Sequence, residues 1–130
     1  MNTGSCHCGK VRFEISADLG DVRYCYCETC RKLSGAAFSV VALVPKHNFK
    51  FLGEKPELKL YKSSADKYRY YCGDCCSPIY VQVTSRPDEM RIRLGLLDYE
   101  PKINISGHMW VSEKPRWHQI NDDLPQAEEF

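Results

Sequence analysis

Cysteine spacing constrains the fold of this chain more than any other feature. Eight cysteines occur among 130 residues. They form three short groups, which are Cys6 and Cys8; Cys25, Cys27 and Cys30; and Cys72, Cys75 and Cys76. A Cys-x-x-Cys segment lets one tight turn point two thiolates at one metal ion. The alternative is a disulfide framework, which needs an oxidising compartment. In a reducing compartment, closely spaced cysteines are more often metal ligands.

Two of these groups can together make one complete metal site. Structural zinc takes four ligands, and Cys6, Cys8, Cys72 and Cys75 supply four. Such a site would tie the N-terminal segment to the middle of the chain. Binding of structural zinc is worth about 10–16 kcal/mol, whereas the stability of a whole domain is about 5–15 kcal/mol. We therefore expect loss of this metal to unfold much of the protein.

The remaining group lies in the segment YCYCETCRK, residues 24–32. Three protein ligands with one open position are typical of a catalytic zinc. The fourth position could be filled by Cys76, by His7, by another histidine or by solvent. Adjacent residues of an extended chain point to opposite sides, so we expect Cys76 to pack as a small hydrophobe rather than join Cys75 at a metal. An open zinc can activate a bound thiol or polarise a small carbonyl, which favours a reaction between a thiol and an aldehyde.

Strand patterns dominate the rest of the sequence. The alternation of apolar and polar residues predicts strands over 10–16, 57–64, 67–72, 78–85, 90–97 and, after the turn NISG, 108–112. The apolar run 38–45 predicts a strand that is buried on both faces. A short helix is expected over 28–37, ended by Gly35, and the tail is expected to fray beyond Pro125. These elements predict an all-β fold of packed sheets.

Charge and hydropathy give no support for a nucleic-acid or membrane partner. The net charge is +1, from 18 basic and 17 acidic residues, so electrostatics do not favour nucleic acid or a membrane. No apolar run approaches the roughly 20 residues of a membrane span. The first ten residues lack the basic and then apolar pattern of a secretion signal. We expect one domain over residues 1–130, located in the cytoplasm, with the nucleus as the alternative.

Several motifs resemble a known family. The segments GSCHCGKVRFEI, CYCETCRKLSGAAFSV and YKSSADKYRYYCGDC follow the order and spacing of the glutathione-dependent formaldehyde-activating enzyme family, which also contains the centromere protein V domain. The segment HMWVSEKPRWHQINDDLP resembles the closing part of that family. The resemblance implies a β-tent of packed antiparallel sheets built around a structural zinc at Cys6, Cys8, Cys72 and Cys75. It also implies a second zinc, with an open position, at Cys25, Cys27 and Cys30.

The activity that the resemblance implies is a carbon–sulfur lyase that condenses formaldehyde with glutathione to S-hydroxymethylglutathione. Cys25, Cys27 and Cys30 are the predicted catalytic residues. Arg31 and Lys32 follow them directly and could bind the carboxylates of glutathione. The sequence departs from the family at Tyr26, where relatives usually have His, and at Cys76, where they usually have Gly.

One further residue set and two other functions complete the hypotheses. Ser63, Ser64 and Arg69 match a family pattern, and we expect them to make structural hydrogen bonds or ion pairs rather than to contact the substrate. The main alternative to an enzyme is a non-catalytic zinc module of the same fold that binds a protein or nucleic acid. The other alternative is a redox sensor whose three-cysteine group releases zinc on oxidation. The enzyme hypothesis predicts a small-molecule thiol and an aldehyde as partners.

Overall fold

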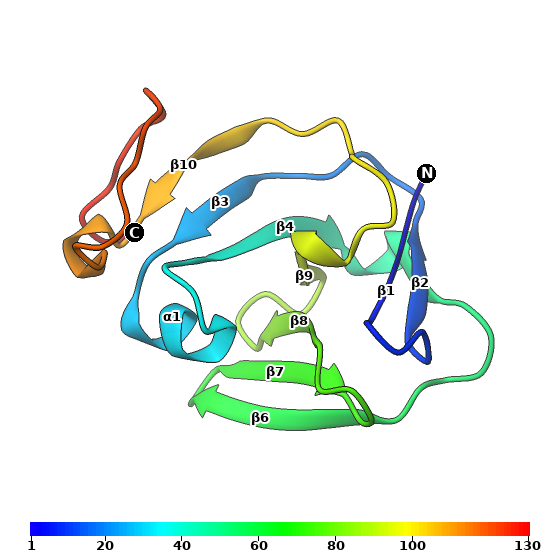
Figure 1. Cartoon of the computed structure of the whole chain (residues 1–130). Coiled ribbons are helices and arrows are strands. Elements are labelled where there is room, and N and C mark those ends of the chain that lie inside the picture. Colours follow the sequence, from blue (N-terminus) through cyan, green and yellow to red (C-terminus); the bar gives the residue numbers. More distant parts are fainter.

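The strands form two sheets in the computed structural model, which describes all 130 residues (Figure 1). The smaller sheet has the order β1-β2-β5 and contains β1 (Asn2–Ser5), β2 (Arg12–Ile15) and β5 (Phe49–Phe51). The larger sheet has the order β10-β3-β4-β9-β8-β7-β6. Its strands are β3 (Val22–Cys25), β4 (Ser39–Pro45), β6 (Leu58–Ser64), β7 (Lys67–Cys72), β8 (Pro78–Val83), β9 (Glu89–Arg93) and β10 (Ile105–Met109). All pairs of neighbours are antiparallel except β10 and β3. The predicted all-β class is confirmed.

The hydrophobic core lies between the two sheets. Phe13 and Ile15 of β2 alternate with exposed Arg12 and half-buried Glu14, and they pack against side chains of β4 and β9. The core members contributed by the larger sheet are Val44, Met90 and Ile92. Fully burying a side chain of this size contributes about 1.5–3 kcal/mol. This packing fixes which face of the larger sheet is turned toward the smaller one.

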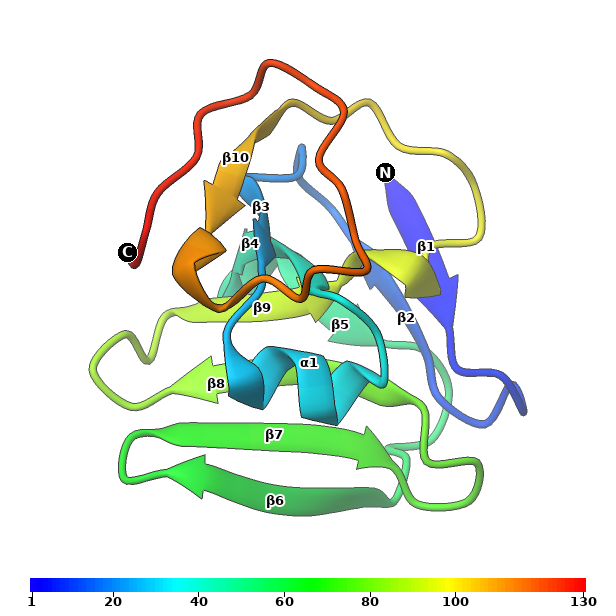
Figure 2. The same ribbon diagram turned by 60° about the vertical axis from the view of Figure 1, so that its left-hand side comes forward.

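The opposite face of the larger sheet carries α1 (Glu28–Ser34), as Figure 2 shows. The helix begins after Cys27, whose sulfur accepts a hydrogen bond from the N–H of Cys30. It ends at Gly35, which has the left-handed backbone angle φ of 63° that glycine adopts without strain. The predicted helix stop is therefore confirmed. Three short 3-10 helices, η1 (Lys46–Asn48), η2 (Leu94–Leu96) and η3 (Val111–Glu113), complete the elements.

Several strand predictions need correction. Strands β1, β3 and β5 are only three or four residues long and were not expected. The strand predicted over 108–112 instead spans Ile105–Met109, because the end of the segment NISG does not form a turn but pairs with β3, with a register shift between Ile105 and Gly107. The chain leaves the sheet at Trp110, where φ is 57°. The strand predicted over 90–97 ends at Arg93 and continues as η2.

Strand β4 is buried on one face only. Ala42 and Val44 lie in the core, whereas Val41 and Leu43 point to the other side and line a cavity. The expectation of burial on both faces is wrong, because a hollow rather than a packed layer lies over this part of the sheet. The continuous apolar run thus supplies both the core and the wall of the cavity.

The C-terminal tail does not fray beyond Pro125, contrary to the prediction. Backbone hydrogen bonds join it to β10 and the residues that follow, from His108 N to Pro125 O (2.9 Å), from Ala127 N to His108 O (2.8 Å) and from Trp110 N to Glu129 O (3.0 Å). The tail therefore runs beside β10 (Figures 1 and 2). Phe130 packs edge to face on Trp110, with 5.4 Å between ring centroids, and lines the cavity.

No helix of the structure has both the length and the apolar character needed to cross a membrane.

Candidate metal centres and cavity

The sulfur atoms of Cys6, Cys8, Cys72 and Cys75 lie within 4.8 Å of one another. The Cys6 and Cys8 sulfurs are 3.6 Å apart, and those of Cys8 and Cys72 are 3.7 Å apart. A tetrahedral zinc with Zn–S bonds of about 2.3 Å would separate its sulfur ligands by about 3.8 Å. The four cysteines that the sequence grouped therefore fit a structural zinc. They join the loop after β1 to the loop after β7.

Backbone N–H groups point at these sulfurs. Val11 N lies 3.3 Å from the Cys6 sulfur, and Asp74 N and Cys75 N lie 3.4 Å and 3.5 Å from the Cys72 sulfur. Hydrogen bonding from Ser77, whose hydroxyl is 3.1 Å from the sulfur of Cys75, lowers the pKa of that thiol to about 5. The hydrogen bonds from the backbone and from Ser77 favour the thiolate form of these cysteines, which is the form that binds zinc.

Cys76 belongs to neither cysteine cluster. Its backbone φ of 64° turns the chain out of the strand direction, and its exposed sulfur lies 3.6 Å from Nζ of Lys59. The prediction that Cys76 packs as a small hydrophobe is wrong, because the left-handed turn carries its side chain to the surface. His7 is also exposed and lies in neither cluster. A left-handed position favours glycine, so the side chain of Cys76 is carried at a conformational cost.

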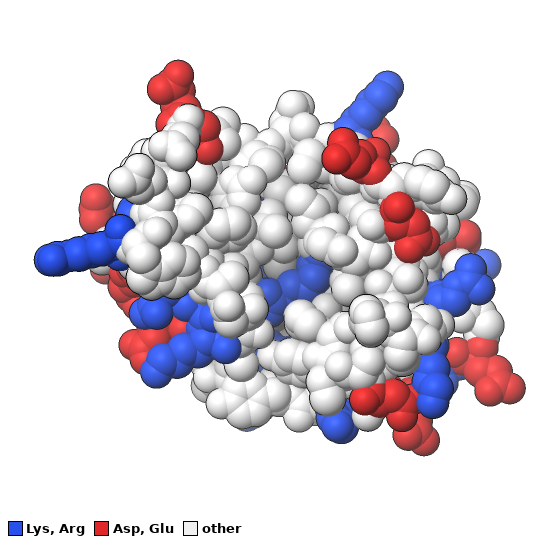
Figure 3. Space-filling view, in the orientation of Figure 1, with Lys and Arg blue, Asp and Glu red and all other residues white.

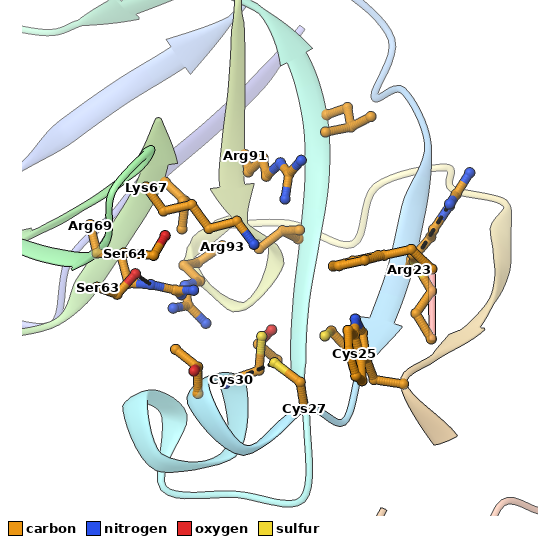
Figure 4. A pocket seen from close by; sticks show the side chains of 18 of the residues that line it. Arg23, Cys25, Cys27, Cys30, Ser63, Ser64, Lys67, Arg69, Arg91 and Arg93 are labelled. Atoms are coloured by element: carbon orange, nitrogen blue, oxygen red, sulfur yellow. Dashed lines mark hydrogen bonds between the residues drawn. The ribbon is translucent and has the colours of Figure 1, made fainter. Parts of the chain in front are cut away.

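The second cluster consists of Cys25, Cys27 and Cys30, whose sulfurs lie within 4.8 Å of one another (Figure 4). Cys25 is the last residue of β3, Cys27 caps α1 and Cys30 lies in the first turn of that helix. The N–H of Tyr26 donates to Met109 O at 3.0 Å, which holds the chain against β10 between the first two cysteines. No histidine, carboxylate or fourth cysteine joins this cluster.

The three sulfurs change one another's pKa. The pKa of Cys30 is lowered to about 2, because Cys25 and Cys27 donate hydrogen bonds to its thiolate. The pKa of Cys25 is raised by the hydrogen bonds that its thiol makes with Cys27 and Cys30. A thiophilic cation such as zinc would replace these protons and satisfy all three sulfurs, so the donor set fits zinc with one position free for another ligand.

Tyr26 lies between two of these cysteines but belongs to the interior behind them. Its side chain is buried, and its hydroxyl lies 2.8 Å from Nδ1 of His108. Nε2 of His108 lies 3.0 Å from both carboxylate oxygens of Asp122. Tyr26 does not line the cavity, because neighbouring residues of the extended chain point to opposite sides. The departure from the family at this position therefore leaves the cavity wall unchanged.

The three-cysteine cluster lies in a cavity of about 800 Å³, within the range of about 300–1,000 Å³ that is usual for small-molecule sites. Val41, Leu43 and Val81 form an apolar part of its wall, and Trp110 and Phe130 line it as well. Figure 3 shows a central hollow in the molecular surface with Lys or Arg side chains at its bottom and a mostly uncharged rim. The shape and the lining suit a small organic ligand with anionic character.

Three arginines of the central strands contribute to this cavity, and the sequence analysis missed two of them. Arg69 of β7 lies opposite Val81, and Val81 lies opposite Arg91 of β9. Arg93 follows two residues later on the same face of β9. The signal that could have revealed them is the alternation of apolar Met90 and Ile92 with two arginines in β9. Charged residues are rarely buried without a reason, so two arginines on one face of a central strand indicate that this face lines a cavity.

The structure places Arg31 and Lys32 on α1 but not along the cavity wall. Nε of Arg31 is buried and has no hydrogen-bond partner. Lys32 is largely exposed and pairs with Glu28 one turn earlier, at 3.1 Å. A role of these two residues in binding glutathione remains a prediction. Ser63 accepts a hydrogen bond from Nε of Arg69 at 2.8 Å, as expected for a structural contact, and both residues also line the cavity.

Comparison with known proteins agrees with this geometry. The sequence pattern of the family described as glutathione-dependent formaldehyde-activating enzyme matches residues 1–113. The chain belongs to the glutathione-dependent formaldehyde-activating enzyme family. The matched residues of this family member include both cysteine clusters and the three arginines of the cavity, whereas the tail that carries Phe130 lies outside them.

Individual relatives cover the chain to different extents. A protein of Halomonas elongata, named as a candidate glutathione-dependent formaldehyde-activating enzyme, is 27% identical over an alignment of 124 residues, and the match spans 90% of this chain and 79% of that protein. A protein of Aspergillus flavus with the same name is 31% identical over 78 residues, and the match spans 60% of this chain and only 41% of that protein. A crystal structure of a Rhodobacter sphaeroides protein has a TM-score of 0.65 at 22% identity, covering 82% of this chain and 99% of the other, and shows the shared fold.

Proposed function

We propose that this protein is a zinc-dependent carbon–sulfur lyase that condenses a glutathione-like thiol with formaldehyde or another small aldehyde. The observation that carries the proposal is the incomplete ligand set of the second cluster. Cys25, Cys27 and Cys30 hold their sulfurs within 4.8 Å of one another, with no fourth protein ligand, in a cavity large enough for a small thiol. Membership of the family, and the names of its relatives, support the same activity.

In the proposed reaction the thiol sulfur bonds to the carbonyl carbon. The carbonyl π bond breaks, and the thiol proton moves to the carbonyl oxygen, so that the product is a hydroxymethyl thioether. Zinc bound at the cluster would lower the pKa of the thiol and polarise the carbonyl. The protein contributes the three thiolates and a cavity wall that restricts the position of the reactants.

The other cysteine cluster has a separate role in this proposal. Cys6, Cys8, Cys72 and Cys75 would hold a structural zinc within one domain that comprises residues 1–130. All eight cysteines are free thiols, which suits the reducing cytoplasm. In this proposal Arg31 and Lys32 would bind a carboxylate of glutathione from α1, outside the cavity wall.

Exchange spectroscopy by nuclear magnetic resonance tests the proposed reaction. The spontaneous exchange between formaldehyde hydrate and its glutathione adduct is measured first, and then the exchange with the zinc-loaded protein. We expect faster exchange with the wild type and with Cys76→Ser, and only the spontaneous rate with Cys30→Ser. A wild-type rate equal to the spontaneous one would exclude the formaldehyde reaction.

A further inference from the structure

The cavity contains more positive charge than its own carboxylates neutralise. Six basic residues line it, and three of these have partners. Arg23 pairs with Asp21, Arg86 with Glu89, and Nζ of Lys67 lies 5.4 Å from the ring centroid of Phe130. The two remaining acidic residues of the lining are also engaged, since Glu28 pairs with Lys32 and Glu113 accepts a hydrogen bond from the N–H of Glu28.

The three other basic residues are Arg69, Arg91 and Arg93, and none has a carboxylate within ion-pair distance. Arg69 is only 5% exposed and donates to the hydroxyl of Ser63, while Arg93 is 7% exposed and has no hydrogen-bond acceptor in the protein. Burial lowers the pKa of Arg91 and Arg93, so their positive charge is held at a cost. Arg69 and Arg93 are thus buried cations without a carboxylate partner, and half-buried Arg91 lies on the same face of β9 as Arg93. Buried charges are normally paired, so this cluster fits an anionic ligand.

Local backbone geometry points the cluster into the cavity. The pairing of β6 with β7 shifts register between Lys62 and Ser64, and this bulge turns Ser63 toward Nε of Arg69. Bulges next to binding sites commonly re-aim a side chain in this way. In Figure 4 the guanidinium groups of Arg69 and Arg93 extend from β7 and β9 into the same space as the sulfurs of Cys27 and Cys30.

Counting charges indicates what kind of anion fits. Three thiolates and a zinc ion carry a net charge of −1, and the three arginines carry +3. A thiolate from the ligand contributes −1, so a further single negative charge balances the site. A carboxylate supplies one negative charge and two oxygens that match the fork of a guanidinium group. A phosphate dianion would exceed the balance.

We propose that Arg69, Arg91 and Arg93 form an anion subsite that binds one carboxylate of a reactant beside the three-cysteine cluster. This inference rests on the proposed function for the metal at that cluster and for a thiol as one of the ligands. The carboxylate belongs either to the thiol or to the carbonyl compound. In the first case the protein selects acidic thiols such as glutathione. In the second case it accepts an oxo acid such as glyoxylate in preference to formaldehyde.

Calorimetric binding to the zinc-loaded protein tests the subsite without any turnover. The first pair of probes is 3-mercaptopropionate, which has a thiol and a carboxylate, and 2-mercaptoethanol, which has only the thiol. We expect the carboxylate probe to bind at least about tenfold more tightly, because charge-assisted hydrogen bonds contribute about that much. Arg93→Met should abolish this preference, whereas Arg116→Met, on the exposed surface outside the cavity, should preserve it. Equal affinity of the wild type for both thiols would overturn the proposal.

Thermal unfolding separates a binding role from a structural one. If Arg93 is buried to hold a ligand, Arg93→Met removes an unpaired buried charge and should leave the melting temperature unchanged or raise it. A clear decrease with the probe preference retained would contradict the subsite. Should Arg93→Met fail to fold, Arg91→Met provides the same comparison, since Arg91 is only half-buried and lies on the same face of β9.

Two further pairs of probes identify the source of the carboxylate. Glutathione is compared with its dimethyl ester, and glyoxylate with acetaldehyde. A loss of affinity in the ester assigns the carboxylate to the thiol, and tighter binding of glyoxylate assigns it to the carbonyl compound. No discrimination in either pair would contradict the proposal. Because these are binding measurements, the subsite can be confirmed even if the exchange experiment shows no acceleration, and it can fail while the reaction is confirmed.

Discussion

The hydroxyl of Tyr26 lies 2.8 Å from Nδ1 of His108, and both side chains are buried. When Nδ1 accepts a hydrogen bond from the hydroxyl, the N–H at Nε2 remains to donate to Asp122, 3.0 Å away. These hydrogen bonds link Tyr26, which lies between two cysteines of the open cluster, to Asp122 in the C-terminal region. The polar groups of Tyr26, His108 and Asp122 hydrogen-bond one another, and none of the three residues lines the cavity.

Removal of the Tyr26 hydroxyl should destabilise the protein. Tyr26→Phe leaves Nδ1 of buried His108 without its partner, which costs about 1–3 kcal/mol of unfolding free energy. Denaturant unfolding of the zinc-loaded protein measures the change. Tyr99→Phe is the control, since that side chain is 80% exposed and its hydroxyl makes no hydrogen bond. Equal stability of the two variants would show that the contact with His108 contributes nothing.

The same hydroxyl predicts how stability changes in alkali. Burial, together with the negative charge of Asp122, raises the pKa of Tyr26 to about 12, whereas an unfolded tyrosine titrates near 10. A raised pKa in the folded state means that the contribution is fully present below about pH 10 and is lost as the pH rises toward 12. Unfolding free energies measured over this range should fall less steeply for Tyr26→Phe than for the wild type. A parallel decrease in both proteins would refute the assignment.

Replacing Cys76 with glycine should stabilise the protein. A left-handed backbone conformation costs about 1–2 kcal/mol for a residue that carries a side chain. Glycine avoids this cost but loses more conformational entropy on folding, which destabilises the protein by about 0.5–1 kcal/mol. The net gain for Cys76→Gly is therefore about 0.5–1 kcal/mol. Cys76→Ala removes the thiol but keeps the side-chain carbon, so it should show no gain. If Cys76→Gly and Cys76→Ala are equally stable, the left-handed backbone angle of Cys76 is not what destabilises the wild type.

The two cysteine clusters should respond differently to loss of one ligand. Cys72→Ser removes a ligand from the site that joins distant parts of the chain, so we expect loss of zinc and extensive unfolding at ordinary temperature. Cys30→Ser should lose one metal ion but keep the fold, because the core between the sheets does not depend on it. Native mass spectrometry and circular dichroism report both quantities. A folded Cys72→Ser protein with only one zinc would reverse the roles assigned to the clusters.

Much of the site could be predicted because cysteine spacing has few interpretations. The sets Cys6, Cys8, Cys72 and Cys75, and Cys25, Cys27 and Cys30, follow from motif spacing and meet in space as expected. The position of Gly35 also marked the end of α1 correctly. In both cases a local pattern, cysteine spacing or a glycine after a helical segment, was enough to predict which residues come together or where the helix ends.

The remainder depends on partners that are distant in sequence. The segment NISG looks like a turn, yet Ile105 pairs with Val22. The tail appeared too polar to be ordered, yet its backbone bonds to β10. The pattern over 90–97 predicted a strand but assigned no role to Arg91 and Arg93, and only the position of β9 between β4 and β8 places them along the cavity. Which strands lie next to one another in a sheet is determined by the tertiary structure and cannot be read from a local sequence pattern.

The central claim, that Cys25, Cys27 and Cys30 hold a metal with a position open to a thiol, is tested most directly with cobalt(II) in place of zinc. Addition of glutathione should strengthen the sulfur-to-cobalt charge-transfer absorption in the wild type, because a fourth sulfur joins the metal. S-methylglutathione, which lacks a free thiol, should leave the spectrum unchanged, and Cys30→Ser should show no response to glutathione. An unaltered wild-type spectrum with glutathione, or the same change with S-methylglutathione, would contradict the account.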